Sequence, residues 1–481
     1  MRSFFVNKEN MITFLICFVI LVVAYFTYGK FVENILQPDA NKKTPALTKT
    51  DGVDYVPMPA WKMFMIQFLN IAGLGPIFGA IMGAKFGVSA YIWIVVGCIF
   101  AGATHDYIAG MLSLRHEGES LPELIGIYLG KGVMNFVRVF SILLMILVGA
   151  VFTSGPAGLL QNLTGMESMW WILIIFSYYL LASMLPIDKL IGKVYPIFAF
   201  ALIFMAVGVM TQLFVQWPSL PEIWDGVANT HPKAESVPIF PMLFISIACG
   251  AISGFHATQS PMMARCMTNE KQGRPIFYGA MIVEGIVALI WAAAANYFFQ
   301  ENGMAENNAA VVVNDITNHW LGKFGAVLAI LGVIFAPITS GDTALRSARL
   351  IVADMFKMPQ EKISKRLIIC VPLFVVTGLI LWYSLTDAEG FNVIWRYFAW
   401  SNQALSVFTL WAATVFLYTF KRKYVAVTLI PAIFMTLVTT SYILIAPEGL
   451  RLPYNIGLII ASVVALALVG IFIYKTRKLN K

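Results

Sequence analysis

Residues 67–79 read QFLNIAGLGPIFG, which places Gly73, Gly75 and Pro76 in the middle of an apolar stretch long enough to cross a membrane. Glycine lowers helix stability, and proline removes a backbone hydrogen-bond donor. In lipid, a broken helix is tolerated only where its freed backbone groups meet protein, water or a ligand. Because Pro76 suits the first position of a new half-helix, the stretch predicts a helix that stops and restarts. An ordinary packing kink is the alternative for this stretch taken alone.

The composition around this stretch is that of a membrane protein. Of 481 residues, 59% are hydrophobic and only 12% are charged, about half of the roughly 25% found in soluble domains. We predict an all-α membrane protein with 13 transmembrane helices, at residues 11–28, 60–82, 87–112, 132–159, 168–185, 190–215, 238–264, 275–299, 322–348, 366–386, 392–419, 424–446 and 453–474. The segments between them are too short to hold an ATPase domain, so a transporter of this kind, if the chain is one, would draw on an ion or substrate gradient.

The basic residues indicate the orientation. If the 13 segments alternate strictly, 26 of the 33 Lys and Arg residues fall on one side of the membrane and 7 on the other. Positive charge collects on the cytoplasmic side, so the N-terminus is predicted outside and the C-terminus inside. The net charge of +8 does not indicate nucleic-acid binding, because the basic residues lie in short clusters between apolar runs rather than along one face.

A second interrupted span lies five spans after the first. Residues 247–261 read IACGAISGFHATQSP. Here Ser253-Gly254 would end one half-helix, and Ser260-Pro261 would start another. Two broken helices that enter from opposite sides are typical of transporters built from inverted repeats, where they form the central substrate site.

The ninth span carries hard oxygen donors, in the stretch PITSGDTALRSAR at residues 337–349. The hydroxyls and the Asp342 carboxylate suit a cation or a proton. Asp342 and Arg346 are four residues apart and could pair on a helix. A purely structural ion pair near the cytoplasmic end is the alternative.

Further ionisable or polar groups fall within predicted spans: His105-Asp106 in the third, Glu284 in the eighth and Asn402 in the eleventh. An intramembrane carboxylate is costly and by default functional, although Glu284 could simply stabilise a helix contact. The five cysteines show no metal-binding spacing, so no metal site is expected. We find no zinc triad, G-x-S-x-G elbow or paired-aspartate motif, and therefore predict no enzymatic activity.

Several motifs resemble those of the carbon starvation protein A family. They lie at residues 44–57, 71–76 (IAGLGP), 102–107 (GATHDY), 243–256 (LFISIACGAISGFH), 339–349 and 401–403 (SNQ). The resemblance implies a LeuT-like fold of the amino acid–polyamine–organocation superfamily. On that basis residues 1–481 form a single transmembrane domain, with a peripheral helix at 11–28, a ten-helix core of two inverted five-helix repeats at 60–419, and two peripheral helices at 424–474. Ile66-Gln67 replace a His-His pair that some members carry.

The resemblance also implies a function and a site. We expect a secondary active transporter of the bacterial cytoplasmic membrane that imports a small carboxylate under carbon starvation, with pyruvate as the leading candidate and H⁺ or Na⁺ as the coupling ion. A peptide or amino-acid symporter, or a nutrient sensor that does not transport, are the alternatives. The only partners expected are the small solute and the lipid bilayer, without nucleic acid, and the only bound ion considered is Na⁺. The expected substrate-binding residues are Asn70, Ala72, Gly73, Leu74, Gly75, Ser253, Gly254, Phe255, His256, Thr258 and Asn402. The expected coupling-ion residues are Ala72, Thr339, Ser340, Asp342 and Thr343.

Overall fold

The computed structural model describes residues 10–52, 54–184, 187–304, 308–360, 362–386 and 390–479, and within these ranges it contains helices and no strand. The all-helical prediction is confirmed. The helices and π-helical turns are α1 Ile12–Phe26, α2 Tyr28–Leu36, α3 Pro45–Thr48, α4 Ala60–Ile71, η1 Gly75–Gly79, α5 Ala80–Ala84, α6 Val88–Val96, η2 Gly97–Gly102, α7 Ala103–Arg115, α8 Leu121–Leu129, α9 Lys131–Thr164, α10 Ser168–Ala182, α11 Ile187–Gln216, α12 Ile239–Ser246, α13 Gly254–Ala264, η5 Arg274–Gly279, α14 Ala280–Asn302, α15 Ala309–Met355, α16 Ile363–Thr386, α17 Gly390–Lys421, α18 Ala426–Ile445 and α19 Tyr454–Leu479.

The number of membrane crossings is only partly accounted for by helix length. Among the described residues, nine helical spans are long and apolar enough to cross a membrane, and the bent pair of α4 with η1 and α5 makes a tenth. The other three predicted spans coincide with α10, with the pair α12 and α13, and with the part of α15 that follows Gly322. The end of the first of these, at residue 185, lies outside the described residues. The count of 13 therefore stays a prediction.

The first predicted break is confirmed. α4 ends at Ile71, Ala72 leaves the helical conformation with ψ 48°, and the chain restarts at η1 with Pro76 in its first turn. The two halves are bent by 54°. Proline fits the start of a helix because the first N–H groups have no intrahelical acceptor.

The second break exists, but its predicted position was wrong. α12 ends at Ser246, and α13 begins at Gly254 with Ser253 as its N-cap. Ser253 therefore starts the second half instead of ending the first, and Ser260 and Pro261 lie inside α13. Pro261 lacks the N–H that would donate to the carbonyl of Ala257, and beside it the hydroxyl of Ser260 donates to the carbonyl of His256 at 3.0 Å.

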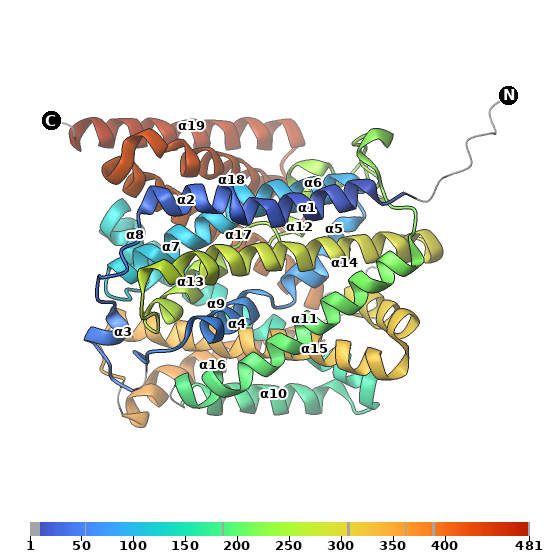
Figure 1. Cartoon of the computed structure of the whole chain (residues 1–481), viewed down its shortest axis with the longest axis horizontal. Helices are drawn as coiled ribbons and strands as arrows, with labels where there is room; N and C mark the ends of the chain where they lie inside the picture. Colours follow the sequence, from blue (N-terminus) through green and yellow to red (C-terminus); the bar gives the residue numbers. More distant parts are fainter. Residues whose placement is uncertain are drawn as a thin grey trace.

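The helices pack in layers around these two breaks. Figure 1 shows α18 and α19 along one long edge and α10 and α16 along the opposite edge, with α4 and α13 between them. α9 packs along α15, and α4 contacts α11, α13, α14 and α15. α1 begins near one end of the long axis and α19 ends near the other (Figure 1). The division into a core at 60–419 and peripheral helices at both ends stays a prediction.

Candidate functional site

The two breaks touch each other. A Cβ atom on Gly75 would lie 2.2 Å from the sulfur and 2.4 Å from the Cβ of Cys249, which lies in the connection between α12 and α13. A Cβ on Gly79 would lie 2.7 Å from the carbonyl oxygen of Ser246. Only glycine permits these approaches, because real Cβ contacts are longer than 3 Å in essentially every case. The first break is therefore packed directly on the second, deep inside the protein.

Asn402 of α17 holds the second break in place. Its Oδ1 accepts hydrogen bonds from the Ser253 hydroxyl at 2.9 Å and from the Phe255 N–H at 2.7 Å. Its Nδ2 donates to the sulfur of Cys249 at 3.2 Å. Gly254 lies against the α17 backbone, where a Cβ would come within 2.6 Å of the Asn402 carbonyl oxygen. The side chain of Ser253, the N-cap residue, does not cap α13. The Asn402 side chain makes the capping hydrogen bond instead, because it accepts from the Phe255 N–H, which has no acceptor within the helix.

Ser340 of α15 contacts the first break. Its hydroxyl lies 2.9 Å from the Asn70 carbonyl oxygen and 3.1 Å from that of Leu69, so it bonds to the last turn of α4. Gly73 is closely packed as well, since a Cβ there would lie 3.2 Å from the Ser340 hydroxyl and 2.7 Å from the ring of Phe152. The structure therefore brings Ser340 to the first break, where Ala72, another member of the expected coupling-ion set, lies.

The other members of that set have different partners. The hydroxyls of Thr339 and Thr343 donate to carbonyls of their own helix, at 2.8 Å and 3.1 Å. Asp342 accepts a hydrogen bond from the Tyr195 hydroxyl of α11 at 2.7 Å, and its Oδ1 has no partner. Arg346 donates to the Ala182 carbonyl at 2.7 Å. The expected Asp342–Arg346 pair is not among the ion pairs found in the described part of the chain; Tyr195, from a distant helix, is the partner of Asp342 instead.

Two amide side chains on the last turn of α4 are buried without partners. Gln67 and Asn70 are both 0% exposed, and neither the amide nitrogen nor the amide oxygen of either side chain has a hydrogen-bond partner. They are three residues apart and share one helix face. Buried amides are normally satisfied by protein groups, water or a ligand, so this pair beside a helix break marks a place where water or a polar ligand would bind.

The remaining expected substrate residues are packed inside the protein. Ala72 and Leu74 are buried, and the Leu74 side chain lies against Gly155 of α9. The hydroxyl of Thr258 donates to the Phe255 carbonyl at 2.6 Å. These contacts are structural in this conformation.

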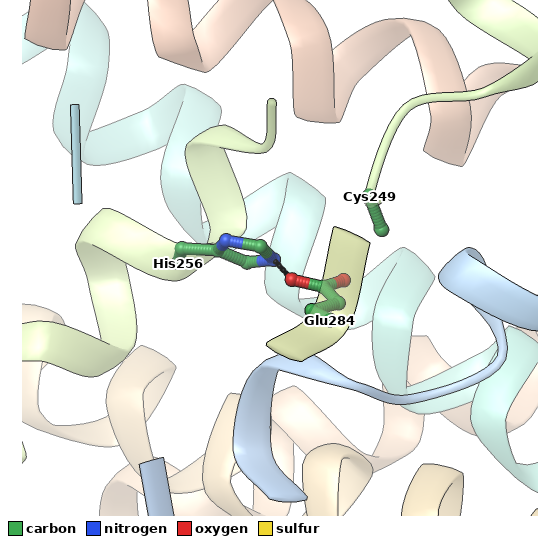
Figure 2. A group of neighbouring side chains, drawn as sticks. All are labelled: Cys249, His256 and Glu284. Carbon is green, nitrogen blue, oxygen red and sulfur yellow. Dashed lines mark ion pairs between the residues drawn. The ribbon is translucent and has the colours of Figure 1, made fainter. Parts of the chain in front are cut away.

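The polar groups that the sequence placed in separate spans form one cluster. His105 and His256 each place Nδ1 2.8 Å from an oxygen of Asp106, and His256 places Nε2 3.4 Å from Glu284 Oε2. All four side chains are 0% exposed. Figure 2 shows the imidazole of His256 facing the carboxyl group of Glu284, with Cys249 beyond that carboxyl group. Sequence reasoning found each residue but not their association, because three helices contribute them.

Cys249, His256 and Glu284 offer donor atoms that lie within 4.8 Å of one another, a spacing that alone would admit a metal ion. The sulfur, however, is packed on Gly75 and accepts the amide of Asn402. We therefore do not assign these residues as metal ligands.

Two cavities lie away from the breaks. One, of about 890 Å³, runs between α8, α9, α17, α18 and α19 and is lined mainly by apolar and aromatic side chains. The other, of about 370 Å³, is lined by charged groups that include Lys42, Arg115 and Glu270.

Comparison with known protein families identifies the family of this chain. The family model described as carbon starvation protein CstA matches residues 9–163, 156–320 and 302–442. The chain belongs to the CstA family. An uncharacterized membrane protein of Haemophilus influenzae is 42% identical over 62% of this chain and 94% of its own length.

Named relatives of this CstA-family chain are transporters. The peptide transporter CstA of Campylobacter jejuni is 27% identical, over 93% of this chain and 81% of its own. The pyruvate/proton symporter BtsT of Escherichia coli is 25% identical, over 88% of this chain and 79% of its own. This chain is accordingly a multi-pass membrane transporter and not an enzyme.

Solved structures show the same fold. The structure of MhsT in complex with L-phenylalanine matches with a TM-score of 0.57 at 13% identity, over 84% of this chain and 98% of that one. A manganese transporter of Eremococcus coleocola matches with a TM-score of 0.53 at 13% identity, over 89% and 99%. The predicted LeuT-like fold is confirmed; at this identity the likeness concerns the fold alone.

Proposed function

We propose that this CstA-family transporter imports a small carboxylate, with pyruvate as the leading candidate, by alternating access at the junction of its two broken helices. The observation that carries this proposal is the pair of unpartnered amides, Gln67 and Asn70, on the turn of α4 that leads into the first break. Amide N–H groups are suitable donors to a carboxylate, and an amide oxygen can accept from a hydroxyl or from water bound with the substrate. The protein would lie in the bacterial cytoplasmic membrane with its N-terminus outside.

The close packing at the junction favours a small substrate. Gly73 and Gly75 have no space for even one added carbon atom against Phe152 and Cys249. Admitting a ligand requires the breaks to separate, and a molecule of a few heavy atoms requires less separation than a peptide. Transporters of this architecture bind substrate at such half-helix ends and close around it.

Peptide transport is the second candidate. Relatives from four bacterial species are named peptide transporters, and a peptide also carries a carboxylate. The same amides could bind its C-terminus. The two candidates therefore differ in the size of the site when it is open.

We favour H⁺ over Na⁺ as the coupling ion, because the buried carboxyl groups of the membrane-spanning core can carry a proton. A sodium site needs several oxygen atoms that are free to coordinate. A hydroxyl that donates its hydrogen to a carbonyl keeps its lone pairs for a cation, so the Ser340 hydroxyl beside the Leu69 and Asn70 carbonyl oxygens leaves Na⁺ as the alternative. Transport that depends on sodium and fails in Thr339→Ala would contradict this assignment.

Counterflow tests the substrate. Liposomes that contain the purified protein and are loaded with unlabelled pyruvate should take up labelled pyruvate rapidly and saturably from outside. Dipeptides added outside should compete poorly, at least tenfold less well than pyruvate. If dipeptides compete for uptake and unlabelled pyruvate does not, the protein transports peptides. If no imposed gradient or exchange produces saturable pyruvate uptake, pyruvate transport is excluded.

Asn70→Leu tests whether the unpartnered amide serves a ligand. An unsatisfied buried amide costs about 1–3 kcal/mol, so an apolar side chain of similar size should leave the melting temperature unchanged or raise it. The KM for pyruvate should nevertheless rise at least tenfold, because a donor to the carboxylate is lost. A lower melting temperature with unchanged KM would show that Asn70 is structural. Asn318→Leu on the exposed face of α15 is the matched control.

A further inference from the structure

The side chains of Asp106, His256 and Glu284 come from three separate elements and meet where a proton could be held. Asp106 lies on α7, His256 on α13 two residues after its start, and Glu284 on α14. His256 bridges the two carboxyl groups, with Nδ1 2.8 Å from Asp106 and Nε2 3.4 Å from Glu284. We propose that this triad is the proton-coupling site of the transporter, an inference that rests on the proposed function.

His105 Nε2, His256 Nε2 and both Glu284 oxygens have no hydrogen-bond partner, and of these His256 Nε2 and Glu284 Oε2 lie 3.4 Å apart, where one proton could join them. Asp106 is satisfied on both oxygens if His105 and His256 each donate from Nδ1. In that tautomer His256 Nε2 is an acceptor, and it has no hydrogen-bond partner. Both oxygens of Glu284 also lack partners. A proton between Glu284 Oε2 and His256 Nε2 would satisfy both groups at once as those atoms close the 3.4 Å gap.

The charges around the triad require such a proton. Within the described part of the chain, the ion pairs of Asp106 and Glu284 are formed with histidines alone. The Cys249 sulfur lies within 4.8 Å of the His256 and Glu284 donor atoms, and Cys98 packs against Gly285, the residue after Glu284. Neither thiol carries a positive charge to offset a carboxylate. Two ionised carboxylates beside neutral histidines would leave two uncompensated negative charges in a site with no exposure, which proteins avoid by binding protons.

The second break couples this proton to the transport cycle. An ion drives a conformational change only if the two conformations bind it differently. His256 belongs to α13 and would move with the second half-helix, whereas Glu284 and Asp106 belong to other helices. A rotation of α13 that widens the gap between His256 and Glu284 leaves each group without the other, and so changes the affinity of the site for its proton.

Infrared difference spectroscopy of the purified full chain tests the site without any substrate. Between acidic and alkaline pH, the wild type should show the C=O stretch of a protonated carboxylic acid that disappears together with changes in imidazole bands. Measured in an Asp342→Asn background, which removes another buried carboxyl group with an unpartnered oxygen, Glu284→Gln should lose that carboxylic-acid signal. In the same background, His256→Gln should shift the pH at which the signal titrates by at least one unit. The matched control is Glu222→Gln, another buried carboxylate, bound to the start of α1 through the N–H groups of Ile12 and Thr13; it should leave the signal unchanged.

A signal that persists in Glu284→Gln, or that His256→Gln does not shift, would overturn the proposal. So would stoichiometric binding of Zn²⁺ or Mn²⁺ alone, measured by calorimetry and lost in Glu284→Gln, because the unmet atoms would then belong to a metal site. In liposomes, accumulation driven by an imposed pH gradient should fall at least tenfold in Glu284→Gln, and unchanged accumulation would overturn the proposal as well. Failure of the wild type to transport pyruvate would refute the proposed substrate, whereas the infrared result would still decide the proton site.

Discussion

Replacing Gly75 by alanine is expected to abolish transport. The added Cβ would lie 2.4 Å from the Cβ of Cys249, so a rotation of the cysteine sulfur cannot relieve the clash and the connection between α12 and α13 must move. Overpacking of this kind costs about 1–3 kcal/mol of stability. The larger effect is on function, because the two breaks must close on one another to occlude a substrate. We expect the initial rate of counterflow to fall at least tenfold and the melting temperature to drop moderately.

A second change should reverse this effect. In Gly75→Ala/Cys249→Gly the added methyl group occupies the space left by the cysteine side chain, so part of the transport rate should return. Gly158→Ala is the control, because a Cβ at Gly158 in α9 meets nothing within 4 Å; it should be neutral or slightly stabilising. If Gly75→Ala transports normally, or if the double variant is as inactive as the single one despite proper folding, the direct contact of the two breaks does not govern transport.

Replacing Asn402 by alanine is expected to reduce both stability and transport strongly. The change would leave the Ser253 hydroxyl and the Phe255 N–H buried without their acceptor. Each unmet group costs about 1–3 kcal/mol. α13 would lose the group that fixes its first turn, and with it the position of His256. We expect at least a tenfold loss of counterflow rate together with a clearly lower melting temperature.

The conservative change separates this role from direct substrate binding. Asn402→Asp keeps the acceptor oxygen, loses the donor to Cys249 and adds a buried ionisable group. At acidic pH, where that carboxyl group is neutral, it should recover much of the stability lost in Asn402→Ala. Asn318→Ala on the exposed face of α15 is the matched control and should change neither quantity. If Asn402→Ala instead raises the KM and leaves the melting temperature unchanged, Asn402 contacts the substrate rather than holding the break.

Local chemistry is what made the first break predictable. Gly73, Gly75 and Pro76 are sufficient to stop a helix and restart it, and the structure bends there by 54°. The second break was placed too late in the chain, because Ser260 and Pro261 also have the chemistry of a helix start. The position of the second break is fixed by Asn402 on another helix, which accepts hydrogen bonds from the Ser253 hydroxyl and the Phe255 N–H. A local sequence pattern cannot predict a contact between residues so far apart in the chain.

Contacts between residues distant in sequence also explain why the candidate site was only partly predicted. The hydroxyls near Asp342 were identified from their chemistry, but the partner of Asp342 is Tyr195, whose hydroxyl has no distinctive motif around it. Gln67 was noted only as a departure from relatives with histidines, and its lack of any partner is a property of the packed protein. Asp106, His256 and Glu284 were found separately, since only the packing of α7, α13 and α14 brings them together.

The measurement that tests the central claim most directly is an experimental structure of the full chain determined with pyruvate. We expect density for the ligand between residues 72–76 and 253–258, with its carboxylate within hydrogen-bond distance of the Asn70 or Gln67 amide. Density in another place, such as the charged cavity beside Lys42 and Arg115, with the two breaks still packed on each other, would contradict the account.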